Sequence, residues 1–85
     1  MDLNKLKNYT SFTINLKLSD ERRKVFEEVE EFKEECINEN RELQIAEGLD
    51  VITAMVNYLS MLGLSEKEFQ NHLDKLERYK TEKYQ

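Results

Sequence analysis

The 85-residue sequence has no proline, two glycines and one cysteine. Proline and glycine interrupt regular elements and shape turns, so their scarcity argues against a fold of short strands and many turns. With 36% charged and 39% hydrophobic residues, the composition is that of helices rich in Glu, Lys and Leu. A single cysteine excludes a framework of intrachain disulfides. The composition therefore predicts an all-α chain.

A basic surface and a long apolar segment are also missing. The net charge is −5, and basic residues gather only in about the last dozen positions. Binding to nucleic-acid phosphates needs a basic face, so a general nucleic-acid binder is disfavoured. No apolar run is long enough to span a bilayer, and no secretory segment is visible. We therefore expect a cytoplasmic protein with no nucleic-acid or membrane partner.

The length fits one domain, residues 1–85, with an N-terminal segment (1–18) followed by the helices that carry the candidate site (19–80). A chain this short buries a modest fraction of its surface, so one hydrophobic core is barely sufficient. Self-association, as a homodimer or a dimer of dimers, is therefore expected. Within the N-terminal segment, Leu3 and Leu6 fit a short helix. Residues that alternate in the manner of a strand follow at Phe12, Ile14, Leu16 and Leu18.

We predict irregular chain for this alternating stretch, because an isolated strand has no partner inside a helical chain, although it could pair across a dimer. The first long helix is predicted to start at Ser19, which offers a capping oxygen before Asp20 and Glu21. Glu28 lies on one flank of its apolar stripe, with Glu31 further round, and periodicity does not choose Glu31 over Glu30. The stripe consists of Val25, Val29, Phe32 and Cys36.

The polar segment 38–42 contains two asparagines, which tolerate left-handed backbone, and is predicted to reverse the chain. The second helix is predicted from about Arg41. Since no charged residue occurs between Val51 and Leu62, we expect this helix to be buried nearly all round. Its aliphatic stripe, here called the α2 stripe, consists of Ile45, Leu49, Ile52, Val56 and Leu59. The opposite face carries Glu47, Asp50, Ala54, Asn57 and Met61.

Gly63 is predicted to end the second helix in left-handed conformation, and Ser65 with Glu68 forms a capping box for the third. An apolar stripe on the third helix, here called the α3 stripe, is predicted to join the core. It consists of Phe69, Leu73 and Leu76. We thus expect an antiparallel helical hairpin plus a C-terminal helix, which together form a helical bundle on oligomerisation.

Two pairs of acidic residues, Glu28 with Glu31 and Glu47 with Asp50, stand three apart on the paired helices. An antiparallel hairpin can bring all four carboxylates together. Converging anions repel one another, and a bound hard cation with oxygen ligands relieves this repulsion. We therefore predict a Mg2+ site. Either Glu28 or Glu31 would accept a proton from an attacking water, and the sequence does not choose between them.

These acids form an ExxE motif and an ExxD motif separated by fifteen residues. This arrangement resembles the signature of the MazG-like all-α nucleoside triphosphate pyrophosphohydrolases. Segments 24–32 and 47–57 also resemble the two ligand helices of that family, and the resemblance covers roughly 24–79. It implies Mg2+ held by the four acids and hydrolysis of a nucleoside triphosphate between the α and β phosphates. The products would be a nucleoside monophosphate and pyrophosphate, and oligomers built on the paired helices are also implied.

Several departures and alternatives accompany this resemblance. Glu30 stands where the family often carries a small residue. The sequence also resembles the related phosphoribosyl-ATP pyrophosphatases in its acidic residues and short length. Their pattern, however, has a histidine four residues after the aspartate, where this chain has Ala54, so their activity is a minor alternative. The candidate substrate-binding residues are Lys24, Asn57, Lys75 and Arg78. Each of these, like the acids, also fits a solvated or interfacial role in a non-enzymatic helical interaction module.

Overall fold

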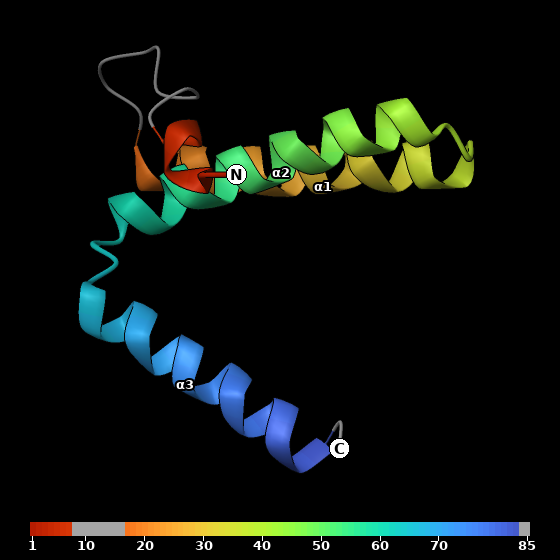
Figure 1. Cartoon of the computed structure of the whole chain (residues 1–85). Helices are drawn as coiled ribbons and strands as arrows, with labels where there is room; N and C mark the ends of the chain where they lie inside the picture. Colours follow the sequence, from red (N-terminus) through yellow and green to blue (C-terminus); the bar gives the residue numbers. More distant parts are fainter. Residues whose placement is uncertain (8–16, 84–85) are drawn as a thin grey trace.

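The computed structural model describes residues 1–7 and 17–83. Its elements are the 3-10 helix η1 (Leu3–Leu6) and the α-helices α1 (Leu18–Ile37), α2 (Arg41–Met61) and α3 (Glu66–Lys83). Figure 1 shows α1 and α2 side by side as an antiparallel hairpin, with η1 against α2 and α3 directed away from the pair. The predicted all-α class and the order of the hairpin and C-terminal helix are confirmed. Phe12, Ile14 and Leu16 lie outside the described residues.

The start of α1 differs from the prediction. The helix begins at Leu18, one residue before Ser19. The Asp20 carboxylate accepts a hydrogen bond from the Lys17 backbone N–H, with Oδ2 and N 3.3 Å apart. An acidic side chain in the first turn can reach back to the N-cap amide. The side-chain acceptor at this helix start is therefore Asp20, which satisfies the Lys17 amide, and not Ser19.

The turn between α1 and α2 lies where the polar segment predicted it. The left-handed residue is Glu39, with φ of 57°, and neither asparagine adopts that conformation. Asn40 instead has an extended backbone, and its Oδ1 accepts a hydrogen bond from the Leu43 N–H at 3.1 Å. An N-cap residue must be extended for its side chain to reach the first turn, so capping by Asn40 displaces the left-handed position to Glu39.

The connection between α2 and α3 matches its prediction. Gly63 has φ of 82°, which a residue without a Cβ adopts at no steric cost. The Glu68 N–H donates to Ser65 Oγ at 3.2 Å, and the Ser65 N–H donates to Glu68 Oε1 at 3.1 Å. The predicted glycine cap and capping box are therefore confirmed.

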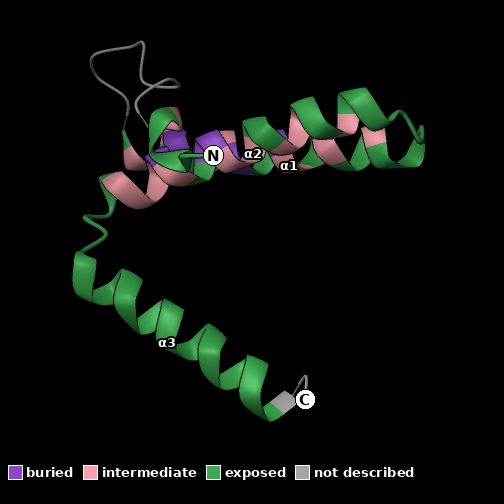
Figure 2. Cartoon of the chain, viewed as in Figure 1, coloured by how far each residue is buried: buried purple, intermediate pink, exposed green. Residues whose placement is uncertain are grey.

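The two faces of α2 are covered in an unexpected way. Ala54 and Asn57, on the side opposite the α2 stripe, are buried in the hairpin (Figure 2). The α2 stripe points away from α1, and its members Ile45 and Leu49 are 47% and 41% exposed. The prediction that α2 is buried nearly all round is wrong for the single chain. One neighbouring helix covers one side of α2, and the smaller, more polar side is the one that allows close approach.

Few apolar side chains are buried. Among the described residues, the buried apolar ones are Val25 and Ala54, whereas four buried residues are polar or charged. Cys36, predicted to belong to the apolar stripe of α1, is exposed near the end of α1, beside the turn that joins α1 to α2. The α3 stripe is also exposed, because α3 makes no contact with the other described helices (Figure 2). A single chain therefore has a very small hydrophobic core.

A contact between Arg22 and Tyr58 joins the start of α1 to the end of α2. Arg22 Nε donates to the Tyr58 hydroxyl at 3.0 Å, and the guanidinium carbon lies 5.8 Å from the ring centroid. The hydrogen bond and the cation–π contact both hold this end of the hairpin. Sequence periodicity did not indicate this pair, because it depends on how far α1 is shifted along α2.

Removal of the α2 cap tests the account of the turn. Asn40→Ala deletes the acceptor for the Leu43 N–H, so we expect unfolding free energy to fall by about 1 kcal/mol. Urea unfolding followed by far-UV circular dichroism measures this change. Asn38→Ala is the matched control, because Asn38 is exposed and right-handed in the same turn, and it should change stability by less than about 0.5 kcal/mol. Equal losses in both variants would contradict the assignment of the cap.

Candidate metal centre

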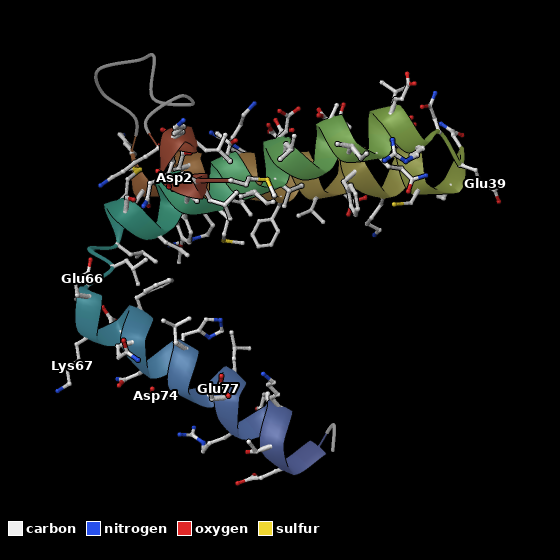
Figure 3. The ribbon with its side chains drawn as sticks, viewed as in Figure 1. Asp2, Glu39, Glu66, Lys67, Asp74 and Glu77 are labelled. Atoms are coloured by element: carbon white, nitrogen blue, oxygen red, sulfur yellow. The ribbon has the colours of Figure 1, made fainter. Side chains whose placement is uncertain are left out.

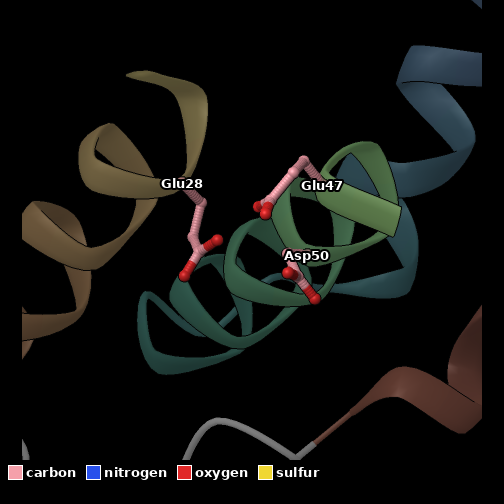
Figure 4. A group of neighbouring side chains, drawn as sticks. All are labelled: Glu28, Glu47 and Asp50. Atoms are coloured by element: carbon pink, nitrogen blue, oxygen red, sulfur yellow. The ribbon is translucent and has the colours of Figure 1, made fainter. Parts of the chain in front are cut away.

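Three carboxylates from both arms of the hairpin converge. One oxygen each of Glu28 on α1 and of Glu47 and Asp50 on α2 lies within 4.8 Å of the others. Figure 4 shows Glu28 reaching from its helix toward the pair on the facing helix. Residues three apart lie on adjacent turns of one surface, so Glu47 and Asp50 share the side of α2 that meets α1. The structure thus brings together three of the four acids that the sequence singled out.

Glu28 is the most buried member of this acidic cluster. The residue is 6% exposed. Its Oε1 accepts from Lys24 Nζ at 2.9 Å. Its Oε2, and the Oε2 of Glu47, are buried and have no hydrogen-bond partner among the described residues. A buried polar atom without a partner costs roughly 1 to 3 kcal/mol, so two such oxygens in one acidic cluster are unfavourable unless a positive group binds there.

Glu31 lies at the edge of the acidic cluster. It is exposed and does not belong to the group of three converging oxygens. Its charge is nevertheless the foremost of the neighbouring charges that raise the pKa of Glu47. Glu30, by contrast, pairs with Lys33 at 3.3 Å on the solvent side of α1. The structure therefore separates the two glutamates that periodicity left equivalent and places Glu31 on the side of the cluster.

The electrostatics of the cluster are those of crowded anions. Loss of hydration raises the pKa of Glu47 above its ordinary value, and the charges of Glu31, Asp50 and Glu28 raise it further. The pKa of Lys24 is also raised, chiefly by its hydrogen bond to Glu28. One cation therefore compensates part of the negative charge on the α1 side, and the α2 side has no comparable partner among the described residues.

The predicted substrate-binding residues occupy three different places. Lys24 stands beside the cluster with 45% of its side chain exposed. Asn57 lies two helical turns beyond Asp50, buried in the hairpin, and its Nδ2 donates to the Thr53 carbonyl at 2.8 Å. Lys75 and Arg78 are exposed on α3, which does not contact the hairpin. A single chain therefore brings Lys24 to the acids and does not bring the two α3 cations.

The donor set fits a hard divalent cation. All three converging groups are carboxylates, the ligand type that Mg2+ and Ca2+ prefer. Neither His72 nor Cys36 joins the group, and both are exposed, so the softer ligands typical of zinc are not contributed by either residue. The orphaned oxygens of Glu28 and Glu47 supply an observation independent of residue type, because they are atoms that a bound cation would satisfy.

Comparison with protein-family models, with curated proteins and with solved structures gives no match. The resemblance to the MazG-like pyrophosphohydrolases therefore stays a prediction carried by the residues themselves. Within residues 1–7 and 17–83, no helix has both the length and the apolar character needed to cross a membrane.

Lys24→Met tests the role of the neighbouring cation. The substitution keeps a long side chain but removes the charge paired with Glu28, so the cluster becomes more negative. We expect Mn2+ or Mg2+ to bind about tenfold more tightly, and the metal-free protein to melt at a lower temperature. Isothermal titration calorimetry measures the affinity. Lys33→Met, which removes an exposed pair on the same helix, is the control, and an identical affinity in both variants would count against the Lys24–Glu28 account.

Glu47→Gln tests the crowding of the acids through pH. A raised folded-state pKa means that the folded protein binds the proton more tightly, so the free energy of unfolding falls as pH rises from 4.5 through the folded-state pKa. In EDTA, the variant should therefore melt above the parent at neutral pH and lose that advantage below pH 4.5. Calorimetric melting of both proteins across this range gives the difference. Glu34→Gln, on the exposed side of α1, should show a small difference that does not vary with pH.

Proposed function

We propose that this protein is a Mg2+-dependent nucleoside triphosphate pyrophosphohydrolase that converts a (d)NTP to a nucleoside monophosphate and pyrophosphate. The observation that carries this proposal is the convergence of Glu28, Glu47 and Asp50, together with the buried oxygens of Glu28 and Glu47 that have no hydrogen-bond partner among the described residues. The resemblance of the ExxE and ExxD spacing to the MazG-like family supplies the reaction. We also propose a cytoplasmic location and association as a homodimer or a dimer of dimers.

Within this proposal, Glu28, Glu47 and Asp50 hold the metal and Glu31 adds a fourth carboxylate at the exposed edge. When bound, Mg2+ would neutralise phosphate oxygens and so reduce the repulsion that protects a polyphosphate from nucleophiles. Lys24 stands at the exposed side of the same cluster, where its ammonium can pair with a phosphate oxygen once it leaves Glu28. The chain thus offers oxygen ligands and one neighbouring cation for a phosphate substrate.

Glu31 is the residue that we assign to water activation. Water would add its oxygen to phosphorus at the α–β bridge while the bridging P–O bond breaks, and the released proton would pass to a carboxylate. Glu28 is buried, and one of its oxygens already accepts from Lys24. Glu31 is exposed beside Glu47 and is not among the three closest oxygens, so its carboxylate is available to accept a proton. This choice resolves within the proposal what the sequence left open.

A non-enzymatic helical interaction module is the second candidate function. The exposed α3 stripe, together with the exposed Ile45 and Leu49 of the α2 stripe, favours it, because an interaction module presents apolar helix faces of this kind. A panel of nucleotides, with phosphoribosyl-ATP included for the minor alternative, separates these possibilities. Release of pyrophosphate that requires Mg2+ and stops with EDTA is expected for the enzyme and not for the module. The pattern of the phosphoribosyl-ATP pyrophosphatases has a histidine at the position that Ala54 occupies here. Ala54 is fully buried.

Asp50→Asn is the decisive substitution for the proposed reaction. It preserves the shape of the side chain and removes one charge, so we expect pyrophosphate release to fall roughly a hundredfold or more, with the metal-free fold as stable as the parent or slightly more so. Glu34→Gln, exposed on α1, is the control and should retain activity.

The same variants give a readout that does not depend on turnover. Mg2+ should raise the melting temperature of the parent by mass action and should do so much less for Asp50→Asn. Full activity of Asp50→Asn together with an unchanged Mg2+-dependent melting shift would contradict both the metal-site assignment and the proposed enzymatic function.

A further inference from the structure

A cavity lies where η1, the end of α2 and the start of α3 meet. Its volume is about 700 Å³, which is within the range of small-molecule sites in proteins. η1 contacts α2, and both line the cavity together with α3, so the cavity is enclosed by three elements rather than by one helix face. Its α2 residues Val56 and Leu59 belong to the α2 stripe, opposite the face that carries Asp50. The cavity is therefore separate from the acidic cluster.

Part of the lining is apolar. Val56 and Leu59 come from α2, Leu64 from the α2–α3 connection and Phe69 from α3. Phe69 and His72 stand three apart, so their rings lie on adjacent turns of the same side of α3. Phe69 is 50% exposed and has surface left to bury. The aliphatic or aromatic side chain of a small ligand would therefore gain by leaving water for this surface.

The charged groups of the lining have opposite signs and come from different elements. Lys7 stands at the end of η1, whereas Glu66 and Glu68 stand in the first turn of α3. Figure 3 shows Glu66 at the start of α3 and the next residue, Lys67, pointing away from the hairpin. Glu68 Oε1 already accepts from the Ser65 N–H and hydroxyl. The ion pairs among the described residues include neither Lys7 nor Glu66.

We infer that this cavity binds an apolar α-amino acid as its zwitterion, with the carboxylate at Lys7, the ammonium at Glu66 and the side chain against Phe69. Such a ligand carries one anion and one cation on the same carbon, which matches a site with one base, one free acid and an apolar surface. It would supply a partner for each of the two charges that do not pair with each other. It would also connect η1 to α3, a helix that makes no contact with the hairpin.

Other classes of small ligand fit this lining less well. A nucleotide or another polyanion would meet two carboxylates beside one lysine, and a polyamine would meet the Lys7 ammonium. A hard metal ion would find at most two carboxylates, of which that of Glu68 is engaged in the helix cap. A neutral hydrocarbon would remove water from Lys7 and Glu66 without offering either a partner. The zwitterion is the class that uses both charges.

Isothermal titration calorimetry of the full chain with L-phenylalanine, in EDTA, tests the inference. We expect saturable binding of one ligand per chain. N-acetyl-L-phenylalanine lacks the ammonium and L-phenylalaninamide lacks the carboxylate, so each should bind about fivefold or more weakly than L-phenylalanine. These ligands need no protein variant, so the comparison does not depend on how a substitution affects folding.

Matched variants assign each end of the ligand to one residue. Glu66→Gln should weaken the binding of L-phenylalanine about fivefold or more, but should not weaken that of N-acetyl-L-phenylalanine, which has no ammonium to lose a partner. Lys7→Gln should act in the same way on L-phenylalanine and spare L-phenylalaninamide. Lys5→Gln and Glu77→Gln are the controls, because both residues are exposed on the same two helices outside the cavity, and they should keep the parent affinity.

Three results would overturn the inference. The first is a parent protein that shows no saturable binding of L-phenylalanine. The second is equal affinity for L-phenylalanine and its two blocked forms, since the charges would then contribute nothing. The third is affinity that falls as the protein concentration rises, since a second copy of the chain would then fill the cavity. Because EDTA is present and the cavity is separate from the acidic cluster, these outcomes do not depend on the proposed pyrophosphohydrolase activity.

Discussion

The packing of α1 against the polar side of α2 is the contact on which the rest of this structure depends. It is the one contact between two α-helices among the described residues, and η1 adds a smaller contact with α2. The close approach uses small residues of α2: a Cβ at Gly48 would lie 3.4 Å from the Phe32 ring, and Ala54 is fully buried. That choice of face brings Glu47 and Asp50 toward Glu28, and it also turns the α2 stripe outward. The acidic cluster and the exposed apolar surface therefore both follow from the packing of this face of α2 against α1.

Repulsion among the carboxylates of the acidic cluster destabilises the hairpin. Three carboxylates share a small, partly dehydrated volume, two of their oxygens lack partners among the described residues, and Lys24 compensates on one side. Burying charges without full pairing usually lowers stability, so such an arrangement is typical of a site whose partner arrives from solution. The donors are of the type that hard cations prefer, and Glu31 is exposed beside them.

The outward α2 stripe and the detached α3 leave apolar side chains of the single chain exposed. The proposed metal and the proposed second copy compensate different deficits of the single chain, one electrostatic and one hydrophobic. In both cases the free energy comes from a species that binds the folded state and not the unfolded one. The two are also separable in space, because the converging oxygens lie between α1 and α2, whereas the exposed α3 stripe lies on a helix that does not contact the hairpin.

The sequence by itself determined the helical class, the turn at 38–42, the left-handed Gly63 and the capping box at Ser65 and Glu68, because these depend on residues close together in the chain. It also determined that Glu47 and Asp50 share a face, since helical periodicity is local.

Tertiary structure alone decided which face of α2 meets α1, that Glu30 points to solvent while Glu31 stays beside Glu47, and that Arg22 meets Tyr58. It also left Cys36 and the α3 stripe exposed, although their periodicity resembles that of a core. Periodicity identifies an apolar face but not the surface that covers it, because that depends on packing between segments distant in the chain.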